Sequence, residues 1–446
     1  MSWRRRLPPS SAISQNALVY DQRYNPALEP ILTRPMHNPR PPLLGVAEAL
    51  KHLLDACRPL TDLETVPTLQ ACGRVLAVDQ RSQLDVPPMD NTQMDGYAVR
   101  AAECGSGNAV LKVSQRIPAG HVGEPLEPGT AARIFTGALI PPGADAVVMQ
   151  EQCNFDPVSQ QVTVNHSPAS GEWIRRAGED IRSGSVILAA GTRLRAQELG
   201  LAASVGLNTL PVLRRARVAV FFTGDELTMP GEPLRPGAIY NSNRFMLRGL
   251  LEQLGCEVTD LGNVPDSLEA TRQALRTACA GHDLIITSGG VSVGEEDHVK
   301  SAVEAEGRLN LWQIAIKPGK PLAFGELGQP GKRPTGFIGL PGNPVSSFVT
   351  FLLFVRPFIL ALQGAHPAAP RAYPMRADFN WGKPDRRNEF LRVRINERGG
   401  LDLFPNQGSG VLTSTVWGDG LVDNPPGHVI KAGDTVNFLP FSDLLH

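Results

Sequence analysis

The chain has 446 residues, too many for one ordinary hydrophobic core, and this length predicts two to four domains. Its formal net charge is -1 and 42% of its residues are hydrophobic, so the composition indicates a globular protein and gives no support to a nucleic-acid-binding or membrane-binding one. The six cysteines are widely spaced and form no Cys-x-x-Cys pair, which argues against a disulfide framework or a structural zinc site and favours a cytoplasmic protein.

The first 42 residues differ from the rest of the chain. Trp3-Arg4-Arg5-Arg6 is followed by scattered prolines, with little apolar periodicity and no apolar stretch of a signal peptide. We therefore predict that residues 1–42 form a disordered basic extension. A transit peptide or a basic contact arm is the alternative.

The next part of the chain alternates between two patterns. Residues 44–57 have helical spacing, and a short helical stretch returns at 198–203, so residues 43–65 and 186–214 are assigned to one helical, mixed domain. Between them, residues 66–185 consist of short β-like runs separated by Gly and Pro. This punctuation predicts a β-rich domain of antiparallel strands or a barrel.

Residues 215–366 show a third pattern. The apolar run Val218-Ala219-Val220-Phe221-Phe222 precedes a helix opened by Asn241-Ser242-Asn243, and a run at 257–261, a helix at 267–280 and a strand at 283–287 follow. This alternation predicts a three-layer α/β domain with a parallel-rich, doubly wound sheet. The apolar run at 345–355 is too short to span a bilayer and predicts a buried helix.

A Pro-rich link leads to the last region, residues 370–446. Side chains alternate between apolar and polar at 390–395 and again near 436–439, which predicts a C-terminal β-barrel-like domain. The predicted fold class is therefore multidomain α/β, with β-rich and mixed domains attached to the central α/β domain.

The strongest motif is Thr287-Ser288-Gly289-Gly290-Val291-Ser292-Val293-Gly294-Glu295-Glu296-Asp297, directly after a buried strand. Glycine amides and small hydroxyls in such a turn predict a phosphate or oxyanion cradle, and a helix starting near Asp297 would point its positive end at the same place. A tight turn without a ligand is the alternative. Ser292 also lies in a Gly-x-Ser-x-Gly match, but the oxyanion loop and the later acid and histidine of a serine hydrolase do not stand out.

Two further motifs favour an anion site. Lys317-Pro318-Gly319-Lys320-Pro321 follows the apolar run at 311–316 and holds two lysines on a stiffened turn. Gly339-Leu340-Pro341-Gly342-Asn343-Pro344 precedes a helix with Ser346 in its first turn. The alternative for the lysine motif is a solvated turn, and the alternative for the second motif is a plain turn at the start of a helix. No Walker A or Gly-x-Gly-x-x-Gly fingerprint is present, so ordinary kinases and dehydrogenases lack support.

Acidic residues stand at several predicted loop ends. Beside a phosphate cradle such carboxylates would repel the ligand unless a hard cation bridged them, which indicates Mg²⁺. Taken singly, each is more often a cap or turn residue. These residues are Asp95, Asp180, Asp225, Glu226, Asp266 and Asp297.

Three more motifs, read with those of the α/β region, resemble a known family. They are Met94-Asp95-Gly96-Tyr97-Ala98-Val99-Arg100, Arg133-Ile134-Phe135-Thr136-Gly137-Ala138 and Phe222-Thr223-Gly224-Asp225-Glu226-Leu227. The α/β motifs alone would fit molybdopterin adenylyltransferases or competence-damage-type nucleotide pyrophosphatases equally well. With the three added motifs, the chain is similar to the molybdopterin molybdenumtransferases, the family that includes the E domain of gephyrin. The resemblance runs from about residue 43 to residue 441.

This resemblance implies a reaction. Adenylylated molybdopterin and molybdate would be the substrates, Mg²⁺ would assist cleavage of the adenylate, and AMP would leave as molybdenum enters the pterin, in the last step of molybdenum cofactor biosynthesis. The resemblance also implies a homodimer in which Asp95 and Thr136 of one subunit reach the pterin site of the other. A molybdopterin adenylyltransferase and the recipient molybdoenzymes would be further partners, with neither nucleic acid nor membrane involved.

The resemblance further implies the site residues. The catalytic set is Asp95, Thr136, Asp180, Glu226, Asp266, Asp297, Lys317 and Lys320, with Asp95, Glu226 and Asp297 as metal ligands. The substrate-binding set is Thr287, Ser288, Gly289, Gly290, Ser292, Gly294, Pro341, Gly342, Asn343, Pro344 and Ser346. One departure is Gln313, where relatives often carry lysine, so the cationic clamp is expected to be weaker here. An adenylyltransferase and a non-enzymatic scaffold are the competing hypotheses.

Overall fold

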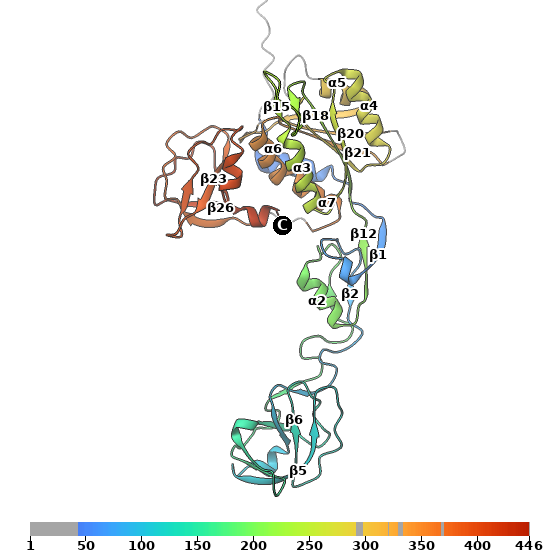
Figure 1. Cartoon of the computed structure of the whole chain (residues 1–446), viewed down its shortest axis with the longest axis vertical. Coiled ribbons are helices and arrows are strands. Elements are labelled where there is room, and N and C mark those ends of the chain that lie inside the picture. Colours follow the sequence, from blue (N-terminus) through green and yellow to red (C-terminus); the bar gives the residue numbers. More distant parts are fainter. Residues whose placement is uncertain (1–42, 291–297, 320, 329–332, 367–369, 446) are drawn as a thin grey trace, which may run out of the picture. The chain divides into compact units, whose positions relative to one another are not determined.

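The central feature of the fold is a six-stranded sheet in the order β16-β13-β17-β21-β20-β18 (Figure 1). The computed structural model describes residues 43–290, 298–319, 321–328, 333–366 and 370–445, so the predicted N-terminal extension lies outside it. The strands of this sheet are β13 (Arg217–Thr223), β16 (Glu257–Val264), β17 (Leu284–Ser288), β18 (Gly307–Gln313), β20 (Pro321–Leu327) and β21 (Thr335–Leu340).

The sheet is mixed rather than wholly parallel. Strands β16, β13, β17 and β21 are parallel, as the alternation of strands and helices predicts, whereas β20 and β18 run antiparallel at one edge. Only short segments separate β18, β20 and β21 along the chain, and short connections can join antiparallel strands but not parallel ones. The sheet is therefore parallel-rich, as predicted, with an antiparallel edge.

Helices cover both faces of the sheet and form two separate cores. Val218, Val220 and Phe222 of β13 point into one core, and Ala219 and Phe221 point into the other. A strand buried on both faces has a continuous apolar sequence, which explains the run predicted at this position. The first core is covered by α1 (Val46–Asp55), α3 (Ser242–Gln253), α6 (Pro344–Thr350) and α7 (Arg356–Leu362), and the second by α4 (Leu268–Cys279) and α5 (His298–Glu306).

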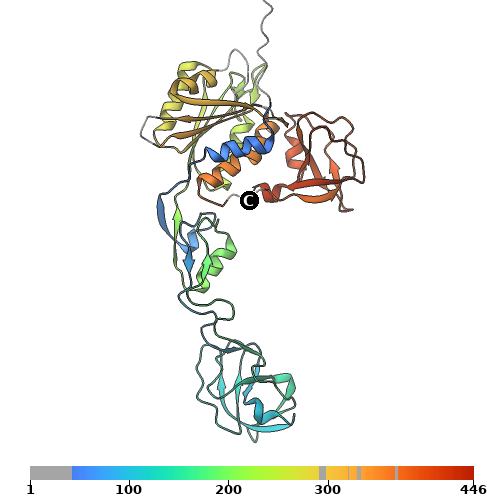
Figure 2. The ribbon, with the colours of Figure 1, turned by 180° about the vertical axis from the view of Figure 1, so that it is seen from behind.

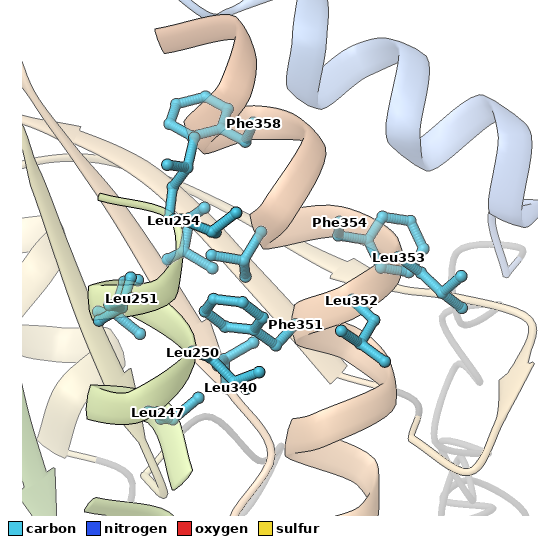
Figure 3. Close-up of a cluster of buried hydrophobic side chains, with 14 of the residues drawn as sticks. Leu247, Leu250, Leu251, Leu254, Leu340, Phe351, Leu352, Leu353, Phe354 and Phe358 are labelled. Atoms are coloured by element: carbon cyan, nitrogen blue, oxygen red, sulfur yellow. The ribbon is translucent and has the colours of Figure 1, made fainter. Parts of the chain in front are cut away.

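The longest apolar helical stretch lies within the first core. It runs over Pro344–Leu362 and joins α6 to α7 through a π-helical turn, η4 (Phe351–Val355). By length and apolarity alone the stretch could span a membrane, but 94% of its apolar window is buried in the protein. Figure 3 shows Phe351 and its neighbours packed beside Leu247, Leu250 and Leu251 of α3 and Leu254, which directly follows that helix. The prediction of a buried helix is confirmed.

This helix continues beyond the predicted limit at residue 355. Pro357 stands in the first turn of α7, directly after the π-helical turn. A proline removes one backbone donor from a helix, and a wider turn is a place where a helix can absorb such an irregularity. The helix therefore extends to Leu362 and carries its apolar side chains along the first core, beside α1 (Figure 2).

The β-rich region holds a second six-stranded sheet, in the order β7-β4-β6-β5-β9-β8. Its neighbours are antiparallel as predicted, except for β5 and β6, which are parallel. Its strands are β4 (Gly96–Val99), β5 (Ala109–Ile117), β6 (Thr130–Ile134), β7 (Ala146–Met149), β8 (Cys153–Asp156) and β9 (Gln161–Val164). One helix, α2 (Ala196–Ser204), and three two-stranded sheets flank this sheet along the chain. The two-stranded sheets pair β1 (Leu63–Pro67) with β12 (Thr209–Leu213), β2 (Gln80–Arg81) with β11 (Val186–Leu188), and β3 (Asn91–Thr92) with β10 (Ile174–Arg175).

The C-terminal sheet takes one strand from the α/β region. The predicted run at 311–316 is divided, because β18 ends at Gln313 and the short strand β19 (Ile316–Lys317) pairs in parallel with β23. This pairing places Lys317 against the C-terminal sheet. The remaining elements of this region are β22 (Tyr373–Arg376), β23 (Asn388–Ile395), β24 (Leu401–Leu403), α8 (Thr413–Trp417), β25 (Gly420–Asn424), β26 (Thr435–Pro440) and α9 (Phe441–Leu445).

Candidate active site

A cavity of about 630 Å³ lies beyond the carboxyl ends of β13, β17 and β21. This is the edge of a parallel sheet where ligands bind, and the volume is ordinary for a small-molecule site. The C-terminal region contributes part of its wall. The lining residues are Thr223, Gly224, Glu226, Asp266, Gly289, Gly290, Lys317, Pro318, Gly319, Pro341, Gly342, Asn343, Ser346, Arg387, Gln407, Gly408 and Ser409.

Two glycines allow the chain to turn sharply at the end of β17. Gly289 and Gly290 have φ angles of +99° and +62°, in the left-handed region that favours glycine. A Cβ on Gly289 would lie 2.7 Å from the carbonyl oxygen of Thr223, so the ends of β13 and β17 touch here. The N–H of Gly289, however, donates to the carbonyl of Leu340 at 3.1 Å. This amide is therefore already used by the sheet, and Gly289 contributes space to the cavity rather than a donor.

A buried polar network lies beneath the floor of the cavity. The Asn243 side-chain amide donates to Ser288 Oγ and to the carbonyl of Gly342, both at 2.8 Å. Ser288 is 3% exposed, and its hydroxyl also lies 3.0 Å from the carbonyl of Pro341 and 3.1 Å from Ser347 Oγ. The network therefore connects the loop after β21 to β17 and α3, and the Ser288 hydroxyl is occupied by protein groups.

The cations of the cavity are paired with acids of the C-terminal region. Lys317 Nζ lies 3.0 Å from the buried carboxylate of Glu389 and 3.5 Å from Asp385, and it stands 5.7 Å from the centroid of the Trp381 ring. Arg387 donates to the two carboxylate oxygens of Asp385 at 3.0 and 2.8 Å. Hydrogen bonds from Arg387 hold the pKa of Asp385 well below its usual range, against the effect of burial and with help from Lys317. Lys317 and Arg387 therefore share one acid and are held in fixed positions.

Comparison with known proteins identifies the family. Three family models match in chain order: the MoeA N-terminal region (domain I and II) over residues 44–206, the probable molybdopterin binding domain over 219–361 and the MoeA C-terminal region (domain IV) over 374–441. A molybdopterin molybdenumtransferase from Haemophilus influenzae is 40% identical over 90% of this chain and 100% of its own length. The chain belongs to the molybdopterin molybdenumtransferase family.

Other relatives agree with this assignment. A molybdopterin molybdenumtransferase from a Nostoc species is 38% identical over 78% of this chain and 80% of its own length. The crystal structure of a molybdopterin biosynthesis moeA protein from Pyrococcus horikoshii matches with a TM-score of 0.77 and 30% identity, covering 90% of this chain and all of that one. The predicted multidomain α/β fold class is confirmed by this structural match.

The cavity of this molybdenumtransferase family member contains nine of the predicted site residues. Glu226 and Asp266 both lie at its wall and both are exposed, as expected of side chains that face a ligand site. The nine are Glu226, Asp266, Gly289, Gly290, Lys317, Pro341, Gly342, Asn343 and Ser346. Four other predicted residues, Ser292, Gly294, Asp297 and Lys320, lie outside the described residues.

Several predicted residues do not line the cavity. Asp95 and Thr136 form a pair of their own, in which Asp95 Oδ1 accepts from the Thr136 amide at 2.8 Å and from its hydroxyl at 2.7 Å. The hydrogen bond from the Thr136 amide, and to a smaller extent the one from the Thr136 hydroxyl, lowers the pKa of Asp95. Asp180 is exposed, Thr287 and Ser288 are buried beneath the cavity, and Pro344 begins α6. Gln313 ends β18 and is also absent from the cavity wall.

The predicted metal ligands do not form a complete site within the described part of the chain. Asp95 does not line the cavity with Glu226, Asp297 is outside the description, and no three His, Cys, Asp or Glu side chains among the described residues gather into a metal-binding group. The two carboxylates at the cavity wall, Glu226 and Asp266, still suit Mg²⁺, which proteins often hold through one or two carboxylates together with phosphates of the substrate.

The residues that the C-terminal region contributes to the cavity were not predicted from the sequence. Arg387 lines the cavity, and Asp385 and Glu389 fix the cations there. The only signal for them was the charged stretch that precedes the alternating strand at 390–395. Nothing local in the sequence shows that β19 and β23 pair, because Lys317 and Glu389 lie 72 positions apart.

Proposed function

We propose that the chain is an enzyme that transfers molybdenum from molybdate to adenylylated molybdopterin, with release of AMP, in the final step of molybdenum cofactor biosynthesis. Membership of the molybdopterin molybdenumtransferase family supports this proposal. The observation that carries it is the composition of one cavity, in which Lys317 and Arg387 lie with the carboxylates of Glu226 and Asp266. A substrate that carries phosphate and needs a divalent cation requires both kinds of side chain.

The two basic residues would bind the oxyanion groups of the substrates. Lys317 is fixed by Glu389, and Arg387 is fixed by Asp385, so neither side chain has to be ordered when the ligand arrives. An incoming phosphate or molybdate would then receive hydrogen bonds from groups already in place. The loop 341–343 would shape the opposite wall, held by the Asn243 hydrogen bond to Gly342.

Glu226 and Asp266 would hold Mg²⁺ together with a phosphate of the substrate. The cation would neutralise negative charge that develops on the phosphate when the adenylate anhydride breaks. A direct test is a Mg²⁺ titration of the protein with AMP present, in which Asp266→Asn should weaken binding of the metal independently of any turnover.

We further propose that the active unit is a homodimer and that each site takes Asp95 and Thr136 from the partner subunit. Asp95 is half-buried and Thr136 is exposed; the two are hydrogen bonded to each other and are absent from the wall of the cavity formed by their own chain. A reaction that needs them therefore has to bring in a second copy. We also expect the protein to act in the cytoplasm, where molybdopterin adenylyltransferases and recipient molybdoenzymes would meet it.

Release of AMP tests the proposed reaction. Purified protein would be incubated with adenylylated molybdopterin, Mg²⁺ and molybdate, and AMP would be measured with time. Asp266→Asn should lower kcat/KM on the order of 100-fold, because a ligand of the cation is lost. Glu269→Gln is the matched control, since Glu269 is a nearby exposed acid of α4 that does not line the cavity, and it should leave the rate unchanged. Absence of AMP release stimulated by molybdate would contradict the proposal.

Co-expression of two inactive variants tests the shared site. In a heterodimer of Asp95→Asn and Asp266→Asn, one cavity has an intact Asp266 and receives an intact Asp95 from the partner. Random pairing would restore about a quarter of the wild-type activity, since half of the dimers would have one complete site. Asp156→Asn is the control for Asp95, because Asp156 also accepts from a hydroxyl and an amide on the surface of the same region. No recovery in the mixture would rule out sites shared between subunits.

A further inference from the structure

A second cavity, of about 520 Å³, shares no lining residue with the first. It lies where the start of α2, the start of α7 and the C-terminal helix α9 meet. The lining residues are Cys72, Gly73, Arg193, Leu194, Arg195, Ala196, Arg356, Pro370, Arg371, Tyr373, Ser442 and Asp443. Neither the motifs of the sequence nor the proposed reaction accounts for this cavity.

The charge of this cavity is strongly one-sided. Four arginines line it, and Asp443 is the one carboxylate among the lining residues. Asp443 already accepts from the Tyr373 hydroxyl at 3.1 Å, and its main-chain carbonyl accepts from Arg356 Nη2 at 3.1 Å. Arg195 has an acid of its own, Glu198, at 2.7 Å. In the first cavity, by contrast, acids pair with Lys317 and Arg387. At the wall of the second cavity four arginines face one carboxylate, so basic side chains predominate there.

Arg356 is the residue that points most directly to a ligand. It is only 8% exposed, and its Nε atom has no hydrogen-bond partner in the described part of the chain. A buried charged group with an unsatisfied donor is costly unless a partner compensates it. Burial lowers the pKa of Arg356, and the charge of Arg193 lowers it further. Burial likewise lowers the pKa of Arg193. An anion beside these side chains would supply the acceptor that Arg356 Nε lacks and would offset the cost of burying the guanidinium group.

We propose that this second cavity binds a small molecule through a phosphate group. The planar guanidinium fork of arginine matches phosphate, to which it can donate two parallel hydrogen bonds. Arg356 would bind from the buried side of the cavity and Arg371, which is exposed, from its rim. The hydroxyls of Tyr373 and Ser442 add donors, and the volume admits a ligand as large as a nucleotide. The same phosphate chemistry occurs in free pyrophosphate and in a nucleotide such as AMP.

Calorimetric titration of the full-length chain tests this site without measuring its reaction. Inorganic pyrophosphate and AMP would be titrated separately at low ionic strength, where binding between charged groups is strongest. Arg371→Gln and Arg356→Gln should each weaken binding at the second cavity about tenfold, as expected for loss of one charge-assisted contact. Arg371 is exposed, so the Arg371→Gln variant should fold normally even if Arg356→Gln does not.

Two further variants separate this site from the first cavity. Lys317→Gln alters the first cavity only and should leave the second site intact, so failure of the proposed reaction and failure of this proposal are distinguishable. Arg398→Gln removes an exposed arginine that lines neither cavity and should bind like the wild type. Tighter binding of AMP than of pyrophosphate would identify the nucleotide as the ligand type, and the reverse order would identify free pyrophosphate. Equal binding by wild type and Arg371→Gln, or loss of all binding in Lys317→Gln, would overturn the proposal.

Discussion

Replacing Asn243 with alanine should damage both the stability of the α/β domain and its active site. The substitution removes two hydrogen bonds of 2.8 Å, to Ser288 and to Gly342. At about 0.5–1.5 kcal/mol each, the two bonds account for about 1–3 kcal/mol. Asn243 Oδ1 is already buried without a partner among the described residues, so alanine also removes an unfavourable group. The expected net loss is therefore about 1–2 kcal/mol, toward the lower end of the range.

Two measurements follow from this estimate. For a domain of this size, 1 kcal/mol corresponds to about 2–4 °C, so calorimetry should show the transition of the α/β domain lowered by about 2–8 °C. Because Gly342 lines the cavity, release of its carbonyl should also lower kcat/KM for AMP release about tenfold.

The matched control for this prediction is Asn263→Ala. Asn263 Oδ1 accepts one hydrogen bond from Asn241 at 2.7 Å, but Asn263 is exposed and does not line the cavity. This variant should lose no more than about 1 kcal/mol and keep its kcat/KM. If Asn243→Ala matched the wild type in both measurements, the polar network would not be what holds the loop after β21, and our reasoning about the cavity wall would be refuted.

Two other substitutions test the scaffold. Asp283 accepts hydrogen bonds from the Arg214 guanidinium group at 2.7 and 2.8 Å. Burial opposes ionisation of Asp283, but the hydrogen bonds from Arg214 and from the Arg217 amide outweigh burial and lower the pKa of Asp283. The pKa of Asp283 is lower in the folded state than in the unfolded state, so the stability from this pair is present above about pH 4 and is lost as the pH falls below it. The Tm difference between wild type and Asp283→Asn should therefore shrink from pH 7 to pH 3. A constant Tm difference would contradict this prediction. Phe354→Ala should destabilise the protein by about 3–5 kcal/mol in denaturant titrations, since Phe354 is fully buried in the first core. The half-exposed Phe155 is the control and should change stability by no more than about 0.5 kcal/mol when replaced by alanine.

Local patterns predicted those parts of the fold that local physics determines. The apolar run at 218–222 and the Asn241 cap predicted β13 and the start of α3, because burial on both faces and a side chain that accepts from Arg244 leave a signature within a few residues. The antiparallel edge β20-β18 carried no such signature, since apolar residues in a buried strand look the same in either direction. The short connections between β18, β20 and β21 are the clue that the sequence holds.

The candidate site was likewise predictable only where local patterns determine it. The motifs after β17 and β21 converge because parallel neighbours end at the same edge of a sheet, and Gly289, Gly290 and Gly342 line one cavity. The sequence could not show that the Gly289 amide is used by Leu340, or that Ser288 is turned into the protein by Asn243. Both facts depend on contacts between residues that are 45 and 51 positions apart in the sequence.

The strand β19 explains why the C-terminal region is part of the cavity rather than an attachment to it. This strand leaves the edge of the α/β sheet and pairs with β23, and Lys317 is therefore held against Glu389, which is fully buried. Glu389 also accepts from Trp381 Nε1 at 2.7 Å, so its carboxylate has a fixed position in the C-terminal core. A lysine on a free turn would move over many rotamers and lose entropy on binding an anion. Lys317 has already lost that freedom, and the pairing of two sheets through β19 is the feature that orders it before any substrate arrives.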